Sequence, residues 1–243
     1  MMRKCLVGVV IAFSLQMTFA QDFKKSYKIS AGGQIVIWNY QGDIKIEGYD
    51  GDIIEVVAKK GGPDRDLIEI VDSSFGEGID LHPRYLKFGH GNAMVNFEVR
   101  VPQAVEYNFN RISSVGGKIQ VSNVVGRLRA MSMRGDVEVI NVRGLVSASS
   151  HSGNVKVEID DDSQRSNMRF ASISGNIEVR APSSLDAFVD MTSMAGLLRT
   201  DFPIEIQEMR YGSGRSAQGR LGSGKQILHL RSVQGQVSLM QKG

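Results

Sequence analysis

Short runs of alternating apolar and polar residues follow one another from residue 117 onward, and each run begins at a glycine. In one run Ile119 and Val121 stand two positions apart with polar neighbours, and Val137 and Val139 repeat the pattern. Alternation with a period of two predicts a β-strand with one covered face. A fixed nine-residue step predicts a stack of repeated units. The step is set by Gly117, Gly126, Gly135, Gly144 and Gly153.

The nine-residue runs are of two alternating types, so the predicted structural unit has eighteen residues. Runs of the first type end at Asn123 and Asn141, and asparagine tolerates a positive φ, which predicts a sharp turn. Runs of the second type end in Ser-x-x-Gly, and this ending returns before Gly175, Gly196 and Gly235 after longer intervals. We therefore expect an all-β fold, a β-helix-like β-solenoid whose stacked coils have about 18–22 residues.

Stacking of such coils predicts which residues face the core and which lie side by side on the outside. Glu138 is expected between Gln120 and Lys156, where unlike charges on neighbouring strands stabilise the sheet. Two inward columns should be apolar throughout. One column consists of Ile119, Val137, Val155 and Ile177, and the other of Leu128, Val146, Met168, Val189 and Leu228.

One column of the repeat consists of serine. A row of hydroxyl groups could provide nucleophiles or ligands, or it could satisfy backbone groups at a tight turn. No general base stands at matching positions of the repeat, so we expect the second role. The column comprises Ser114, Ser132, Ser150, Ser172, Ser193 and Ser232.

The region before the regular repeat predicts strands of less regular length. Residues 33–58 fit a first coil, and segment 60–110 is expected to cap or flank it, because a stack exposes strand edges at its ends. No segment after residue 20 has the pattern of an amphipathic helix. The expected organisation is a cleaved signal peptide over 1–20, an irregular β part with the first coil and cap over 21–110, and the repeat solenoid over 111–243.

The first twenty residues have the pattern of a secretory signal. Arg3 and Lys4 precede an apolar run from Leu6 to Phe19, and Ala20 ends a small-residue cleavage site. The alternative is a membrane anchor, but the run is shorter than the ~20 apolar residues that a spanning helix needs. We expect an exported protein of the periplasm, cell envelope or extracellular space, with no transmembrane segment in the mature chain.

Composition and motif spacing exclude several kinds of chemistry. One cysteine cannot form a disulfide framework or a cysteine-based zinc site, and a formal net charge of +3 is weak support for a nucleic-acid partner. The four histidines lack metal-ligand spacing, and His82 and His90 are expected beside a solvated loop. Asp160, Asp161 and Asp162 could gather calcium, but the glycine bend of a calcium loop is missing. We therefore expect no metal, no cofactor and no enzyme activity.

Several motifs together carry a family resemblance. They are Gly32-Gly33-Gln-Ile-Val-Ile, Gly42-Asp-Ile-Lys-Ile, Phe97-Glu-Val-Arg-Val-Pro102 and the repeated Ser-x-x-Gly-[Asp/Asn/Lys]-[Ile/Val]-x-Val. The set resembles the bacterial "putative adhesin" family of unknown function, made of β-strand repeats, and is similar to the head domains of auto-transporter adhesins. The resemblance spans residues 23–240. It implies an exported β-solenoid, and it implies no established reaction and no site residues.

Two functions remain open at this point. The first is a non-catalytic solenoid that presents a surface for adhesion or cell-envelope interaction, with a cell-surface protein or a glycan as partner and no nucleic acid. The alternative is a carbohydrate-binding or carbohydrate-active β-helix protein. The candidate binding residues are Val36, Trp38 and Tyr40, which share the outward face of the strand 35–40 and include the single tryptophan of the chain. Segment 60–110 could instead cover them as a secondary core.

Overall fold

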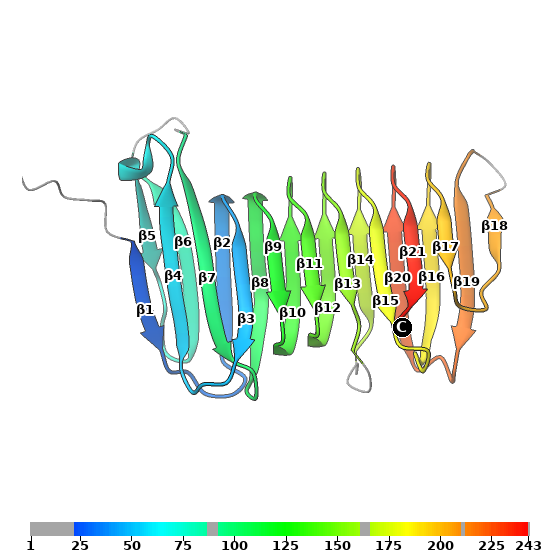
Figure 1. Cartoon of the computed structure of the whole chain (residues 1–243), viewed down its shortest axis with the longest axis horizontal. Helices are drawn as coiled ribbons and strands as arrows, with labels where there is room; N and C mark the ends of the chain where they lie inside the picture. The colour runs from blue at the N-terminus through cyan, green and yellow to red at the C-terminus, as the bar shows by residue number, and fades with distance from the viewer. Residues whose placement is uncertain (1–21, 87–91, 161–165, 210–211, 243) are drawn as a thin grey trace, which may run out of the picture.

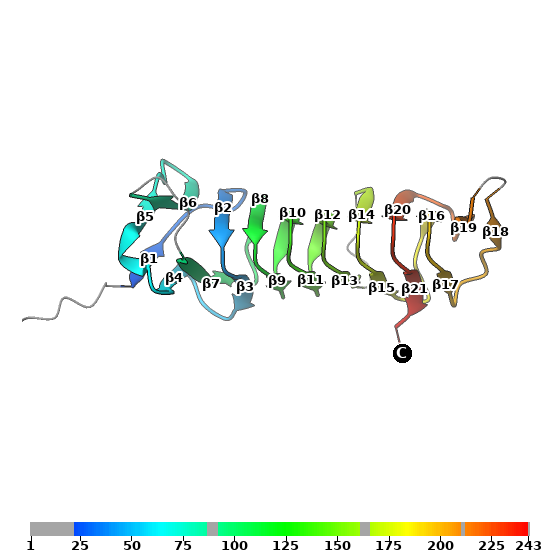
Figure 2. The same cartoon turned by 90° about the horizontal axis from the view of Figure 1, so that it is seen from above.

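The computed structural model describes residues 22–86, 92–160, 166–209 and 212–242. Within these residues the chain forms strands and one short 3-10 helix, η1 (Arg65–Leu67), which confirms the all-β prediction. Within this described part, no helix is long and apolar enough to cross a membrane. The strands form two large sheets that face each other along an elongated molecule (Figure 1, Figure 2). The expected signal peptide lies outside the described residues.

Ten of the described strands form the first sheet, which we name sheet A. In spatial order its strands are β1 (Phe23–Tyr27), β4 (Ile54–Gly61), β7 (Met94–Pro102), β3 (Ile44–Tyr49), β9 (Ile119–Ser122), β11 (Val137–Ile140), β13 (Val155–Glu158), β15 (Ile177–Ala181), β21 (Val237–Gln241) and β17 (Leu198–Thr200).

The other eleven described strands form the second sheet, sheet B. In spatial order these are β18 (Ile206–Glu208), β19 (Arg215–Leu221), β16 (Ala187–Ser193), β20 (Gln226–Ser232), β14 (Met168–Ser172), β12 (Arg143–Ser150), β10 (Val125–Ser132), β8 (Glu106–Gly116), β2 (Gln34–Gln41), β6 (Gly78–Tyr85) and β5 (Ile68–Asp72).

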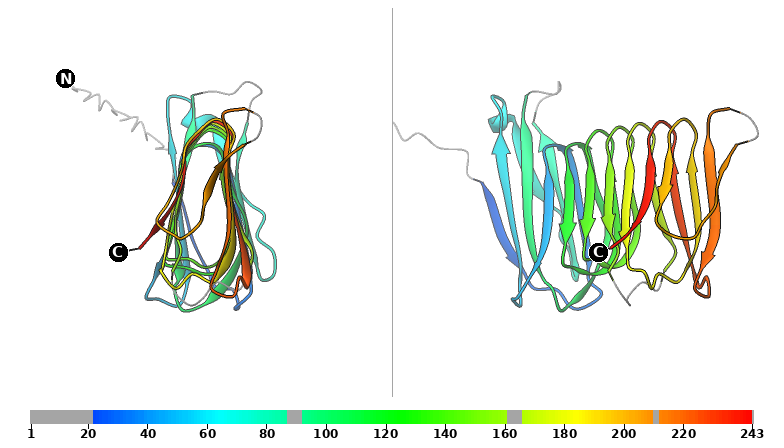
Figure 3. Two further views of the ribbon diagram at one scale, coloured as in Figure 1. Left: turned by 90° about the vertical axis from the view of Figure 1, so that its right-hand side faces the viewer. Right: turned by 45° about the vertical axis from the view of Figure 1, so that its right-hand side comes forward.

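From β8 to β15 the chain crosses from one sheet to the other after every strand. Strands that are adjacent in a sheet therefore come from successive repeats, and they pair in parallel. Viewed along the row, the two sheets form two thin layers joined by short turns (Figure 3). Val137 pairs with Ile119 on one side and with Val155 on the other, which confirms the predicted register of the first column.

The core lies between the sheets and has the two predicted columns, with one correction. Ile119, Val137, Val155 and Ile177 are at most 1% exposed. In the second column Val146 is only half-buried, and Leu145 takes its place at 1% exposed. The pairing of β10 with β12 shifts register at this point, so that Leu128 pairs with Leu145. A bulge of this kind is set by the contact between two strands and leaves no mark on the alternation of either one.

The last repeats do not stack in chain order. β20 lies between β14 and β16, and β21 lies between β15 and β17. Figure 1 shows these red strands inside the row of yellow ones. Along the chain, β16 and β17 come before β18 and β19, which extend the end of sheet B as antiparallel strands. The chain then runs back, and β20 and β21 lie beside β14 and β15.

The N-terminal end is built in a similar way. β2 and β3 lie next to β8 and β9, and the strands of residues 54–102 lie beyond them. There β4 is antiparallel to β7, β1 is antiparallel to β4, and β5 is antiparallel to β6. The boundary expected at residue 110 falls within β8, whose neighbour on one side is β2. Both sheets therefore continue through the boundary without interruption.

At one corner of the stack the serine column forms a hydrogen-bond ladder. Ser132 Oγ donates to the carbonyl oxygen of Gly117 in the previous repeat at 2.9 Å and accepts from the backbone N–H of Gly135 at 2.9 Å. This confirms the structural role expected for the column. The same bond to a glycine carbonyl is made by Ser114, Ser150, Ser172, Ser193 and Ser232.

The residue after each corner glycine adds a second ladder, which the sequence analysis did not identify. Asp136 Oδ1 accepts the backbone N–H of Asn154 at 2.7 Å, and Asn154 Oδ1 accepts the N–H of Asn176 at 3.0 Å. Asn176 Oδ1 in turn accepts the N–H of Gln236 at 2.9 Å. Each short side chain thus satisfies a backbone donor of the next repeat, which explains the Asp and Asn after the corner glycine.

Glycine is required at this corner because the backbones of successive repeats almost touch. A Cβ atom on Gly135 would clash with the carbonyl of Gly117, and one on Gly153 would clash with the carbonyl of Gly135. The next corner is different: Asn123 and Asn141 have φ values of 56° and 52°, as predicted from their place in the repeat.

We predict that Gly135→Ala destabilises the protein by several kcal/mol, because the new methyl group would have to push two backbones apart. Gly78→Ala is the matched control: Gly78 has no positive φ, and the nearest atom to its Cβ would be a carbonyl oxygen at 3.5 Å. This second change should alter the free energy of unfolding by no more than about 0.5 kcal/mol. Urea denaturation of both variants measures the difference, and equal losses would contradict the close corner.

We also predict that Val137→Asp is severe, since it buries a carboxylate between Ile119 and Val155 and costs several kcal/mol. The neighbouring change Glu138→Ala should cost only about 0.5–1 kcal/mol. Glu138 accepts from Lys118 Nζ at 2.8 Å and from Lys156 Nζ at 3.3 Å on the outer face, and the bond to Lys118 lowers the pKa of its carboxyl. Thermal shifts of the two variants provide the test, and similar shifts would contradict the inward position of Val137.

Candidate functional site

The outward face of β2 carries the three residues that the sequence nominated for binding. Trp38 is 36% exposed, Tyr40 is half-buried and Val36 is 8% exposed. Val36 lies between Asp80 of β6 and Arg111 of β8, and these neighbours leave little of it accessible. The accessible part of the nominated face is therefore formed by Trp38 and Tyr40, and binding by these residues stays a prediction.

β6 adds two further rings beside the nominated face and turns it into an aromatic patch. We use this name for Trp38, Tyr40, His82 and Tyr85. The Trp38 ring is 6.5 Å from Tyr40 and 6.5 Å from His82 between centroids, both edge to face. Tyr40 and Tyr85 are 5.7 Å apart in the same geometry, and burial raises the pKa of the Tyr85 hydroxyl.

His82 and Tyr85 were missed because the pairing that brings them here joins distant parts of the chain. His82 was expected beside a loop, but it lies within β6, where Ile37 of β2 pairs with Leu81. Its Nδ1 atom is 3.5 Å from Asp80 Oδ1. His90 lies outside the described residues. No local signal in residues 78–85 indicates which strand they will pair with.

The patch has the properties of a contact surface. Edge-to-face packing fixes the rings relative to one another, and β2 and β6 hold them on a rigid sheet. Aromatic rings fixed in this way offer apolar faces together with hydroxyl, indole and imidazole groups for hydrogen bonds. Such a surface can stack on a sugar ring or on an apolar side chain of a partner protein.

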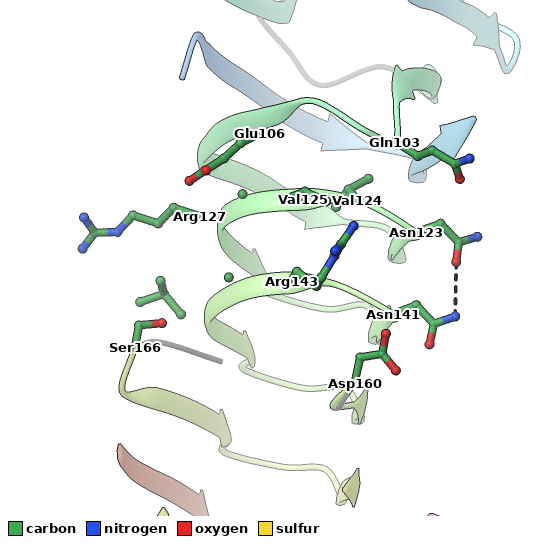
Figure 4. A pocket seen from close by; sticks show the side chains of 13 residues that line it. Gln103, Glu106, Asn123, Val124, Val125, Arg127, Asn141, Arg143, Asp160 and Ser166 are labelled. Atoms are coloured by element: carbon green, nitrogen blue, oxygen red, sulfur yellow. Dashed lines mark hydrogen bonds between the residues drawn. The ribbon is translucent and has the colours of Figure 1, made fainter. Parts of the chain in front are cut away.

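A second concave region lies at the turns that lead from sheet A into sheet B (Figure 4). It is a groove of about 1010 Å³, and Arg127 and Arg143 come from neighbouring repeats in its wall. At its margin Asn141 Nδ2 donates to Asn123 Oδ1 at 3.2 Å, drawn as a dashed line in Figure 4. Ser166, a hydroxyl in the groove, donates to the carbonyl oxygen of Leu145 at 3.4 Å.

The groove shows no assembled acid–base machinery among the described residues that line it. Its carboxylates are Glu106 and Asp160, and Asp160 Oδ1 lies 3.6 Å from Lys242 Nζ. The calcium candidate falls partly outside the described residues, since Asp161 and Asp162 are not among them. In the part of the chain that is described, no group of three or more His, Cys, Asp or Glu side chains could hold a metal ion.

Comparison with known proteins gives one family and several distant structural likenesses. A structure described as a "putative cell adhesion protein" from Clostridium sporogenes has 12% identity and a TM-score of 0.46, over 91% of this chain and all of its own. A "putative adhesin" from Bacteroides fragilis has 15% identity and a TM-score of 0.42, over 92% of this chain and 98% of its own. A "putative lipid binding protein" from Parabacteroides distasonis has 12% identity and a TM-score of 0.33, over the same shares.

Likeness at this level carries no argument about function. A search of curated proteins found no match. The sequence evidence is stronger, and it agrees with the resemblance found in the repeat motifs. A family model described as Toastrack DUF4097 matches residues 97–239, more than half of the chain, and the protein therefore belongs to the Toastrack DUF4097 family.

Proposed function

We propose that the protein is an exported, non-catalytic β-solenoid that attaches to another molecule at the cell envelope or cell surface. The aromatic patch on sheet B is the proposed contact. The observation that carries this proposal is the Trp38 ring, 36% exposed and held between Tyr40 and His82 on a rigid strand. The ring is part of a cluster with Tyr40, His82 and Tyr85. Tryptophan and tyrosine are enriched among the residues that dominate contacts between partners.

The solenoid part of this proposal rests on the repeat of eighteen residues. Glu138 pairs with Gln120 and with Lys156, so neighbouring positions in sheet A are eighteen residues apart in the chain. Sheet B repeats the step, since Ser132 pairs with Ser150. A stack built in this way has flat outer faces that become longer with each repeat, which suits a protein that presents a surface.

Carbohydrate binding is the second candidate, and the same patch favours it. The apolar face of a sugar ring stacks well on an exposed tryptophan, and the Tyr and His groups beside Trp38 can exchange hydrogen bonds with hydroxyl groups. This candidate differs from protein-mediated adhesion in its ligand and leaves the location of the contact unchanged. A soluble glycan that competes for attachment would favour it.

The repeat unit can be tested by deletion. Removing residues 135–152, one unit of eighteen, should leave a folded protein, because β9 can pair with β13 and β10 with β14 in the register that β11 and β12 now provide. Removing residues 135–143 should not, since it joins two strands of the same sheet and disrupts the alternation. Soluble yield and far-ultraviolet circular dichroism compare the two. Similar behaviour of both deletions would contradict the eighteen-residue unit.

The contact itself can be tested at Trp38. Trp38→Ala should abolish attachment to isolated cell envelope while the melting temperature falls by only a few degrees, about what 1 kcal/mol produces, because the ring is partly in water. Phe75→Ala is the matched control, an aromatic residue that is 91% exposed in the part of the chain before β6. It should leave attachment unchanged. A loss of about 3–5 kcal/mol with Trp38→Ala would instead show that the ring is part of a core.

A further inference from the structure

The outer faces of the two sheets differ in how their charges are arranged. On sheet A many exposed charges form pairs, both within strands and between them. Lys118 and Lys156 share Glu138, at 2.8 Å and 3.3 Å. Further pairs on this face are Lys45–Glu47, Lys59–Glu98, Arg100–Glu55 and Arg180–Glu178.

Sheet B carries unpaired arginines on its outer face. The five adjacent strands β8, β10, β12, β14 and β20 contain one carboxylate, Glu106, at the start of β8. Their outward arginines are all exposed, and within the described chain none of them forms an ion pair. These residues are Arg111, Arg127, Arg129, Arg169 and Arg231.

The strand register aligns part of this set into a row that runs along the stack. Arg129 pairs with Ser147, Ser147 with Arg169, and Arg169 with His229. Arg111 continues the row on β8 beside Arg129, whose Nη1 donates to Asn110 Oδ1 at 3.2 Å. We name Arg111, Arg129, Ser147, Arg169 and His229 the arginine row.

Neighbouring members of the row are about 4.8 Å apart across the sheet. The row ends at β16, where Asp190 Oδ2 lies 3.2 Å from His229 Nδ1. The surface is hollowed there: Arg169, His229 and Arg231 line a depression of about 440 Å³, with Asp190 and Thr192 on its far side. The row therefore has the form of a shallow track that crosses the strands.

Nothing in the fold requires this arrangement. Cations on adjacent strands repel one another, and sheet A shows how the same repeat pairs them with carboxylates. Guanidinium groups prefer planar, two-oxygen acceptors such as carboxylates. Ser147, which lies between Arg129 and Arg169, and Asn110, which precedes Arg111, add short polar groups that can bind hydroxyls. The missing counter-charge is best supplied by a ligand that carries both carboxylates and hydroxyls at regular intervals.

We propose that the arginine row binds a linear acidic polysaccharide, which lies across the strands with its carboxylates on Arg129 and Arg169. Single-stranded nucleic acid fits less well, because its binding sites need aromatic side chains between the basic groups for stacking. The outward residues of β10, β12 and β14 include Arg, Ser, Ala, Met and Val and no aromatic side chain. The overall charge of +3 also lacks the basic excess of nucleic-acid domains.

This proposal goes beyond the attachment proposed for the aromatic patch and uses different residues. Trp38 lies on β2 and pairs with Ser113 of β8, two residues after Arg111. It is therefore outside the arginine row, on the strand beyond the end of the row at β8. The two surfaces can be tested separately by substituting one of them at a time.

The experiment measures binding of fluorescently labelled polygalacturonate to the purified mature chain at low salt and at ~150 mM salt. The test variant is Arg129→Gln with Arg169→Gln. The control, Lys45→Gln with Arg180→Gln, removes the same charge from the outer face of sheet A. Melting temperatures confirm that both variants fold. We expect about tenfold or greater weakening in the test variant and no more than about twofold in the control.

Several results would overturn the proposal. The unmodified chain could fail to bind polygalacturonate, or the control could lose as much affinity as the test variant. A single-stranded oligonucleotide or vesicles of anionic phospholipid that compete better than polygalacturonate would show a different class of ligand. Loss of polygalacturonate binding by Trp38→Ala would move the site to the aromatic patch. Failure of Trp38→Ala to affect envelope attachment would contradict only the patch.

Discussion

The rest of the structure depends on how closely successive repeats approach at the serine–glycine corner. Parallel strands about 4.8 Å apart leave no room for a side chain where the chain turns with its backbone pressed against the previous repeat. Only glycine fits at Gly117, Gly135 and Gly153. The backbone groups at that corner are then shielded, and the hydroxyl of Ser132 or Ser150 satisfies a carbonyl that has no other partner in its own turn. Glycine and serine are therefore two parts of one constraint.

This constraint explains why the central repeats could be predicted from sequence. A glycine that must be present in every unit leaves a fixed step, and the alternation after it assigns Ile119 and Val137 to the core. The same local signals failed where the pairing of strands decides the outcome. The step from Val146 to Leu145 is a bulge between two strands. The insertion of β20 between β14 and β16 joins residues that are about sixty positions apart, as in the pair of Ser172 and Ser232.

The candidate site shows the same division. Trp38 and Tyr40 could be nominated because alternation along one strand places them on the outward face. His82 and Tyr85 could not, because their position depends on the parallel pairing of β2 with β6 across a gap of more than forty residues. The arginine row could not be predicted from the sequence either. Its arginines lie on different strands, and only the register of the neighbouring strands places them in line.

The ends of the stack determine which surfaces stay available. An open sheet edge invites pairing with another chain, and parallel repeats would continue that pairing without limit. Here antiparallel strands end sheet A at β1 and sheet B at β5 and β18, whereas β17 ends sheet A as a parallel strand of three residues. These edge strands are very short, as in β17 and β18, or carry lysines, as in β1, and both features discourage pairing with another chain. We therefore assign recognition to the broad outer faces. On sheet A many exposed charges are paired, whereas the arginines on the outer face of β8, β10, β14 and β20 in sheet B have no ion-pair partner among the described residues. This difference in charge pairing makes the outer face of sheet B, and not that of sheet A, the one on which both proposed contacts lie.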